Sequence, residues 1–374
     1  MQKVDIKKIV ERYRQGKATD DDVAFLESWY AWDAQRNQDV PEYTAEEILA
    51  DTDVVWQRLN PKSNKILKWL PYAAAVLIFG ILMLWKGDFL LYNKQMRLDD
   101  VVAQADQGVT IRLADGTVVP LHVEHGGINM GKSIQYTDGT TISELQKDKR
   151  NLQLTLTVPT GTTFHLILDD GTKVWLNAGS SLRYPMRFEG DRREVELEGE
   201  GYFEVAAQFM ISEDSGKPVR KPFLVNTAEQ TISVLGTHFN VEAYPIAASK
   251  TTLIEGRVEI GATGNSKVKK ILNPGQQGVW NEGEIQVQKI DVDNALAWRS
   301  GLFSFHEKTF DEIMQDVSRW YNLEIVYESD IPEETFFGEG YRTENLGSVL
   351  RLLESDKIKY RVTSDRKLII SYRK

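Results

Sequence analysis

Two histidines lie at a spacing that can bind a metal ion. His122 and His125 are three residues apart, and on a helix this spacing would bring two zinc ligands together. In a strand the same odd spacing points the two rings to opposite faces. Because the surrounding region reads as strands, we expect no metal site there. His165, His238 and His306 also fall in strand patterns and are interpreted as polar residues of strands.

Acidic residues offer a second candidate chemistry. Glu198, Glu200 and Glu204 could provide the carboxylate pair of a glycosidase, but we interpret them as surface charges of a strand. Asp169 and Asp170 are adjacent and precede a glycine, which is typical of a turn. The sequence contains no G-x-S-x-G, H-E-x-x-H or Walker motif. We therefore expect no enzyme, with no catalytic residue, cofactor or metal.

The composition argues against other classes of function. The 374 residues carry a net charge of -10, and the pI is about 5.2, so binding to nucleic acid through phosphate neutralisation is not expected. The sequence has no cysteine, which excludes thiolate nucleophiles and disulfides. The apolar share of 41% is that of a globular protein, and the length allows two or three domains.

One segment reads as a membrane-spanning helix. Residues 69–85 (WLPYAAAVLIFGILMLW) contain no charged residue, and with their flanks they reach the roughly 20 residues that a bilayer requires. Trp69, Tyr72 and Trp85 lie where interfacial aromatic residues belong. The sequence therefore predicts a single span at residues 66–86. A cytoplasmic N-terminus is favoured by four basic residues just before the span, Arg58, Lys62, Lys65 and Lys68.

The first 65 residues predict a small all-α domain. Helical spacing marks segments near residues 6–13 and 23–32, and Thr19 with Asp22 makes a capping box before the second segment. A third helix is expected between residues 44 and 61. The second predicted helix has apolar residues in two stripes, and so small a domain can bury only one of them. We expect a partner protein to cover the rest; the candidate contacts are Val23, Phe25, Leu26, Trp29, Tyr30 and Trp32.

The middle region, residues 87–290, predicts an all-β domain, and either a sandwich or a solenoid-like stack fits the pattern. The tripeptide Asp-Gly-Thr occurs three times, beginning at Asp115, Asp138 and Asp170. Asp-Gly between alternating apolar residues is a strong hairpin signal. Further strands are predicted at residues 194–197, 202–205, 223–225, 231–235, 239–244, 252–254, 257–260 and 278–280.

Residues 298–374 predict a compact α+β domain with the element order β-α-β-β-α-β-β. Thr309 and Glu312 form a capping box at the start of its first helix, and Asn322 suits the left-handed position that ends it. A strand near residues 336–341 precedes the second helix. A hairpin closes the chain.

Motifs of the middle region resemble the FecR family of membrane anti-sigma factors. They occur in the family's order, at residues 158–161 (VPTG), 168–185 (LDDGTKVWLNAGSSLRYP), 199–205 (GEGYFEV), 234–241 (VLGTHFNV), 255–258 (EGRV) and 274–277 (PGQQ). The C-terminal region is similar to the secretin/TonB short N-terminal domain that ends such proteins of the Bacteroidetes type.

The resemblance implies a multidomain protein of the inner membrane. Residues 1–65 would bind an extracytoplasmic-function sigma factor in the cytoplasm, and residues 66–86 would cross the membrane once. Residues 87–290, with core motifs at 155–280, and residues 298–374 would lie in the periplasm. The C-terminal domain would there bind the periplasmic signalling domain of a TonB-dependent outer-membrane transducer. The candidate contacts for that transducer are Phe336, Phe337 and Tyr341.

Such a relay would control the transcription of uptake genes, without direct contact to nucleic acid, and a site-specific membrane protease would be a further partner. The alternative interpretation is a membrane-anchored periplasmic glycan-binding module or hydrolase that works through the β-domain. An anchored enzyme needs only a short basic leader before its span. This chain has about 65 residues of patterned helices there, which favours the regulator.

Overall fold

The structure, a computed structural model, divides into two structural units, residues 1–85 and 86–374. It describes residues 6–36, 95–104, 108–131, 133–145, 153–212, 216–245, 247–263, 265–281, 283–330, 336–354 and 357–372. The predicted span at 66–86 and the predicted third helix at 44–61 lie outside these ranges. Within them, no helix has the length and apolar character needed to cross a membrane.

The first unit contains the helices α1 (Ile6–Arg14) and α2 (Asp20–Arg36). Gly16 follows α1 with a φ of 64°, the left-handed conformation in which glycine ends a helix. The backbone N–H of Asp22 donates to Thr19 Oγ1 at 3.3 Å, and the Thr19 N–H donates to the Asp22 carboxylate at 3.2 Å. The predicted capping box is therefore confirmed. Arg12 pairs with Asp22 at 2.7 Å and so joins the two helices.

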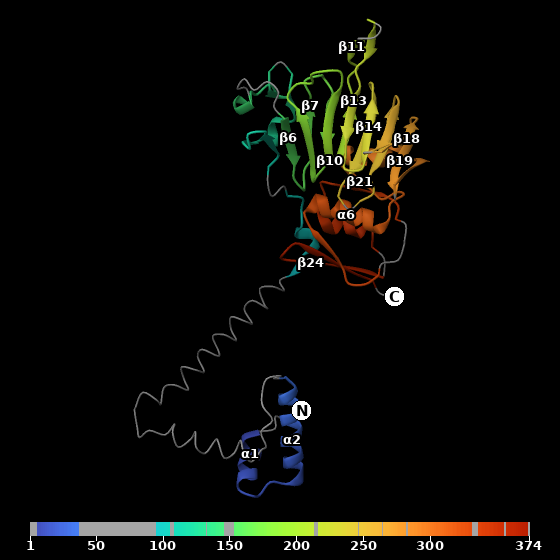
Figure 1. The fold of residues 1–374 in the computed structure, drawn as a ribbon. Coiled ribbons are helices and arrows are strands. Elements are labelled where there is room, and N and C mark those ends of the chain that lie inside the picture. Colours follow the sequence, from blue (N-terminus) through green and yellow to red (C-terminus); the bar gives the residue numbers. More distant parts are fainter. Residues whose placement is uncertain are drawn as a thin grey trace. The chain divides into compact units, whose positions relative to one another are not determined.

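In the second unit, short strands build a β-domain around one core. They are β2 (Thr110–Leu113), β3 (Val118–Pro120), β4 (Ile128–Asn129), β5 (Gln135–Tyr136), β6 (Gln153–Val158), β7 (Phe164–Ile167), β8 (Lys173–Leu176), β9 (Ser180–Pro185), β10 (Arg193–Glu204), β13 (Phe223–Asn226), β14 (Gln230–Val234), β15 (His238–Ala243), β16 (Lys250–Glu255), β17 (Val258–Ala262), β18 (Asn265–Leu272), β19 (Gln276–Asn281) and β20 (Glu284–Lys289). A separate hairpin, β11 (Phe209–Ile211) with β12 (Pro218–Arg220), projects beyond them (Figure 1).

Two sheets share the long strand β10 and enclose the core, like the two faces of a flattened barrel. One sheet has the order β3-β2-β6-β9-β10-β13-β14-β17-β18. The other has the order β5-β4-β7-β8-β10-β15-β16-β19-β20. Alternating residues of both sheets point into the shared core, so the arrangement matches the sandwich of the two predicted alternatives.

The three Asp-Gly-Thr tripeptides form turns of one kind, which confirms their prediction. Gly116, Gly139 and Gly171 have φ values of 85°, 93° and 86°, which favour glycine. In each turn the threonine N–H donates to the aspartate Oδ1 at 2.8 or 2.9 Å. Two of the turns connect β2 to β3 and β7 to β8. The third leads from β5 to the bridge between Gln135 and Thr141.

The prediction of two separate strands at 194–197 and 202–205 was wrong, because residues 194–197 and 202–204 belong to the single strand β10. Gly199 lies between them, where β10 passes from one sheet to the other, and has a φ of 95°. A Cβ at this position would lie 2.4 Å from Ser180 Oγ. Glycine therefore lets one strand serve both sheets without a break.

The C-terminal domain has the predicted element order. It consists of β21 (Leu302–Ser304), α6 (Phe310–Tyr321), β22 (Glu324–Tyr327), β23 (Glu339–Tyr341), α7 (Leu346–Arg351), β24 (Ile358–Thr363) and β25 (Lys367–Tyr372). The Thr309/Glu312 capping box is present, and Asn322 ends α6 with a φ of 52°. Apolar residues of α6, α7 and the sheet form a second core, separate from that of the β-domain.

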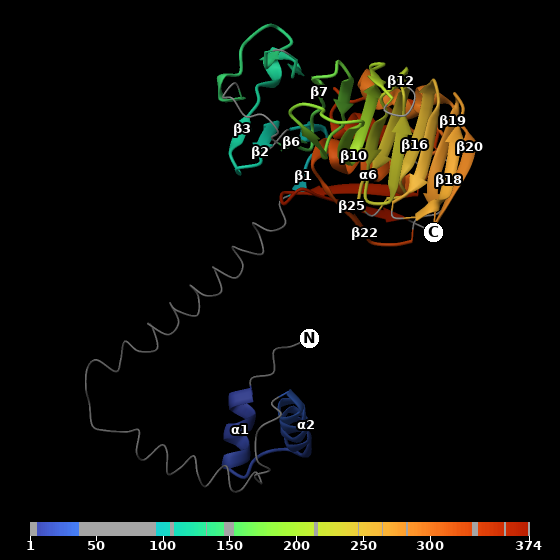
Figure 2. The ribbon, with the colours of Figure 1, turned by 45° about the horizontal axis from the view of Figure 1, so that its top comes forward.

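A strand from early in the sequence completes the C-terminal sheet, whose order is β1-β24-β25-β22. The strand β1 (Gln95–Met96) lies at one edge of it, against β24 (Figure 2). Val101, a few residues later, is buried in the C-terminal core. The described part of this unit therefore begins in the C-terminal domain and only then builds the β-domain.

Candidate functional site

The structure corrects the interpretation of His122 and His125 as strand residues. They flank and end a short 3-10 turn, η3 (Val123–His125), and their rings lie 6.1 Å apart. Each Nδ1 faces a carboxylate, Glu124 at 3.2 Å from His122 and Asp138 at 2.7 Å from His125. Among the described residues, no group of three histidine, aspartate or glutamate side chains is arranged to hold a metal ion.

Glu200 is not the surface charge that the sequence suggested, because it is only 7% exposed. Its neighbours on the same face of β10, Glu196 and Glu198, are exposed. Glu200 belongs to the same alternate series of β10 as these two residues, but it is buried because residues of the C-terminal domain cover this end of the strand. Asp170 also has a second role besides its turn, since it pairs with the buried Arg193 at 2.6 Å.

Amide groups hold both oxygens of Glu200. Asn177 Nδ2 donates to Oε2 at 2.7 Å, and Asn240 Nδ2 donates to Oε1 at 2.9 Å. The amide oxygens of these asparagines accept from residues that follow the β-domain, Asn177 from Arg342 at 2.8 Å and Asn240 from Trp298 at 3.3 Å. Arginine and indole nitrogens are donors only, so both asparagines must turn their NH₂ groups toward Glu200.

The surroundings of Glu200 change its ionisation. Burial, together with the nearby carboxylates of Glu242 and Asp316, raises the pKa of Glu200 to about 7, against the opposing effect of the two asparagine amides. A carboxyl group with this pKa changes charge near neutral pH. The boundary between the two domains therefore contains a titratable group.

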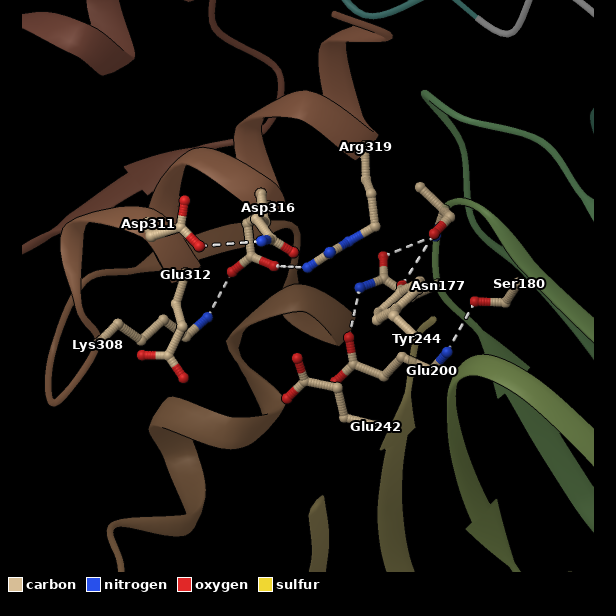
Figure 3. A network of polar contacts seen from close by, with 12 residues as sticks. Asn177, Ser180, Glu200, Glu242, Tyr244, Lys308, Asp311, Glu312, Asp316 and Arg319 are labelled. Carbon is tan, nitrogen blue, oxygen red and sulfur yellow. Dashed lines mark hydrogen bonds and ion pairs between the residues drawn. The ribbon is translucent and has the colours of Figure 1, made fainter. Parts of the chain in front are cut away.

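Asp316 of α6 centres a second cluster at the same boundary (Figure 3). It binds Lys308 at 2.5 Å and also Arg319. Burial alone would raise the pKa of Asp316, but the two cations hold it below its usual value. The Arg319 guanidinium lies 3.9 Å from the ring centroid of Tyr244, which belongs to the β-domain. Tyr244 in turn donates to the carbonyl of Ala178 at 2.9 Å.

Two more ion pairs cross the boundary. Lys250 of β16 pairs with Glu312 of α6 at 2.5 Å, and Arg299 of the 3-10 turn η5 (Ala297–Ser300) pairs with Glu204 at 3.2 Å. Arg299 also lies 4.3 Å from a ring centroid of Trp175. We call the central set the interdomain network; its members are Asn177, Glu200, Asn240, Tyr244, Lys250, Trp298, Lys308, Glu312, Asp316, Arg319 and Arg342.

The interdomain network has the form of a junction. Amides, and no nucleophile, contact both oxygens of Glu200, so the geometry does not resemble a catalytic pair. A cavity of about 340 Å³ lies beside it. Its lining includes the polar side chains Thr252, Gln277, Gln288, Asn294 and Ser304.

This site was not predicted from the sequence. Asn177 and Asn240 lie inside the motifs at 168–185 and 234–241, next to buried apolar residues of the strands. An amide in such a position signals a buried hydrogen-bonded group. Its partners come from a different domain, however, and one sequence does not show which residues they are.

The predicted sigma-factor contacts all lie on α2. Val23, Phe25 and Leu26 are half-buried, and Trp29 is 37% exposed. Tyr30 and Trp32 are also in α2, but their side chains lie outside the described part of the structure.

The predicted transducer contacts differ from one another in exposure. Phe337 and Tyr341 are 71% and 65% exposed. Phe336 is half-buried, with its ring 5.4 Å from that of Phe310. Only two of these three side chains are thus open to a partner as the domain stands.

Comparison with known proteins gives matches in both domains of the second unit. Residues 154–259 match the family described as FecR protein, and residues 302–370 match FecR, C-terminal. Two solved structures of a candidate anti-sigma factor from Parabacteroides distasonis are similar. One is 31% identical with a TM-score of 0.51, over 59% of this chain and 99% of that chain. The other is 30% identical with a TM-score of 0.52, and the match covers 59% of this chain and 100% of that chain. The chain matches no curated protein.

Proposed function

Because this chain belongs to the FecR family of anti-sigma factors, we propose that it is a membrane-anchored regulator of an extracytoplasmic-function sigma factor. This is a family of regulators and not of enzymes. In the proposed arrangement, residues 1–65 bind the sigma factor in the cytoplasm and residues 66–86 cross the inner membrane. Residues 87–374 receive the signal in the periplasm. The uncharged segment at 69–85 supports the span.

The observation that carries the proposal is the interdomain network. A relay needs a rigid path from the domain that receives a signal to the rest of the protein. Arg342, Trp298 and Glu312 each bind a residue of the β-domain. Each of these contacts contributes roughly 0.5–3 kcal/mol to the attachment of the two domains, most where a charged group takes part. The two domains are therefore built to respond to a partner as one body.

Exposed aromatic residues support the two proposed binding surfaces. Trp29 on α2 would contribute to sigma-factor binding, because tryptophan is enriched among residues that dominate binding energy. Phe337 and Tyr341 would contribute to binding a signalling domain of a TonB-dependent transducer. Release of the sigma factor would involve a site-specific membrane protease and would switch on uptake genes.

A reporter for the sigma factor tests this function in cells. The wild type should respond to the inducing substrate. In the double variant Phe337→Ala/Tyr341→Ala the induced reporter activity should be at least tenfold lower than in the wild type. The surface variant Val287→Ala should respond normally. If deletion of the whole gene changes neither basal nor induced reporter activity, the protein does not regulate that sigma factor.

A further inference from the structure

Residues 95–104 run along the C-terminal domain, and we call them the strap. In β1, Gln95 lies opposite Thr363 and Met96 lies opposite Val362, so the strap begins as an edge strand of the C-terminal sheet (Figure 2). The 3-10 turn η2 (Leu98–Asp100) follows β1. The strap next reaches α7, where the Leu346 N–H donates to the carbonyl of Val101 at 2.8 Å.

Side chains hold the strap in place as well. Val101 is 2% exposed and lies inside the C-terminal core, and Met96 and Leu98 pack against that core. Asp99 pairs with Arg351 of α7 at 3.0 Å. At Gly347 a Cβ would lie 2.2 Å from Asp99 Oδ1, so a residue without a side chain lets α7 approach the strap this closely.

The far end of the strap meets the interdomain network. A Cβ on Gly161 would lie 2.6 Å from the carbonyl oxygen of Gln104, so the two backbones touch there. The Gly161 N–H donates to the carbonyl of Arg319 at 3.1 Å. Arg319 itself binds Asp316 and lies against Tyr244. A movement of α6 would therefore reach the strap through Gly161.

The contacts of the strap are few enough to open. The ladder covers only two of the six residues of β24, and the Asp99–Arg351 pair is about half exposed on both sides, so it contributes little. The main anchor is a single buried side chain, Val101. Segments with such sparse contacts are the ones that open locally while the rest of a domain stays folded.

We propose that the C-terminal domain is a clasp for the strap, and that a partner bound to this domain opens the clasp. Opening separates β1 from β24, lifts Val101 out of the core and exposes the backbone of residues 95–104 to cleavage. The clasp itself follows from the contacts of the strap, whereas the partner that opens it rests on the function proposed above.

Cysteine labelling of the full-length protein in detergent tests the clasp independently of signalling, because the chain has no native cysteine. Val101→Cys should react with a maleimide at least 100-fold more slowly than its neighbour Val102→Cys, whose native side chain is 45% exposed. Adding Leu98→Asp should speed the labelling at position 101 at least tenfold and leave that at position 102 unchanged. Equal labelling rates at the two positions in the otherwise native protein would overturn the clasp.

A disulfide tests whether opening is used in signalling. A Cβ at position 347 would lie 3.1 Å from Asp99 Cγ, which is the place that the sulfur of Asp99→Cys would take, so Asp99→Cys with Gly347→Cys can form a disulfide. In cells that carry the sigma reporter, the oxidised pair should reduce the induced response at least tenfold. Asp99→Cys alone and the same pair kept reduced should both leave the response unchanged. A normal response from the fully oxidised pair would overturn the proposal. If the unmodified protein does not regulate the reporter, the proposed function fails, and the labelling rates still decide whether the clasp exists.

Discussion

Arg342 Nη1 donates a 2.8 Å hydrogen bond to Asn177 Oδ1, although 165 residues separate the two in the sequence. The same guanidinium donates through Nε to the carbonyl of Leu302 at 3.2 Å and lies 4.8 Å from the ring centroid of Trp320. It is therefore fixed within the C-terminal domain. Because Asn177 also holds Glu200, one arginine orders the polar groups on both sides of the boundary.

Replacing this arginine should weaken the boundary measurably. Arg342→Leu leaves Asn177 Oδ1 and the Leu302 carbonyl short of a charged donor, so we expect the free energy of unfolding in urea to fall by about 2–4 kcal/mol. The control is Arg361→Ala, whose pair with Glu328 is exposed and should contribute less than about 1 kcal/mol. Equal losses in both variants would mean that the Arg342 contact does not hold the domains together.

Glu200 should make stability depend on pH. Its pKa is raised from 4.5 to about 7 in the folded protein. Between these values the unfolded chain has lost the proton and the folded protein has kept it, so this residue lowers stability as pH rises through that window, and the penalty stays constant above pH 7. We expect its contribution to the free energy of unfolding to fall by on the order of 1–3 kcal/mol.

The variant Glu200→Gln isolates this effect, because glutamine does not titrate. As pH rises from 4.5 to about 7, the wild type should lose stability relative to the variant. Denaturant melts at several pH values in this range measure it. A difference that is the same at every pH would show that Glu200 ionises in the folded protein as it does in water.

The proposed topology can be tested with single cysteines, since the chain has none of its own. Ser28 and Ser364 are both exposed, one in each structural unit, so Ser28→Cys and Ser364→Cys are a matched pair. In cells with a permeabilised outer membrane, an impermeant maleimide should label position 364 and not position 28. Labelling at position 28 with protection at position 364 would reverse the topology.

Motifs formed by residues close together in the sequence predicted most of the fold. The Asp-Gly-Thr turns and the Thr309/Glu312 capping box depend on residues that are neighbours in sequence, and both were found as predicted. The single strand β10 was missed because Gly199 reads as a break, whereas its flexibility allows the strand to pass between two sheets. The pairing of β1 with β24 was also missed, since two residues carry no recognisable strand pattern.

The site could not be predicted in the same way. The alternation along β10 placed Glu200 correctly on the outer face, beside Glu198. Its burial depends on Trp298 and Arg342, which reach it through Asn240 and Asn177 from distant parts of the chain. Burial by another domain leaves no periodic signal in the sequence of the strand that it covers.

The most direct test of the anti-sigma function is the affinity of the full-length protein, in detergent, for the extracytoplasmic-function sigma factor that it is proposed to regulate. We predict that the wild type binds and that Trp29→Ala weakens binding at least tenfold, because truncation of a central tryptophan costs about 2 kcal/mol or more. Circular dichroism should show that the variant keeps its helices, and Phe337→Ala, in the other structural unit, should bind as the wild type does. If the folded wild-type protein does not bind this sigma factor, the central claim is wrong.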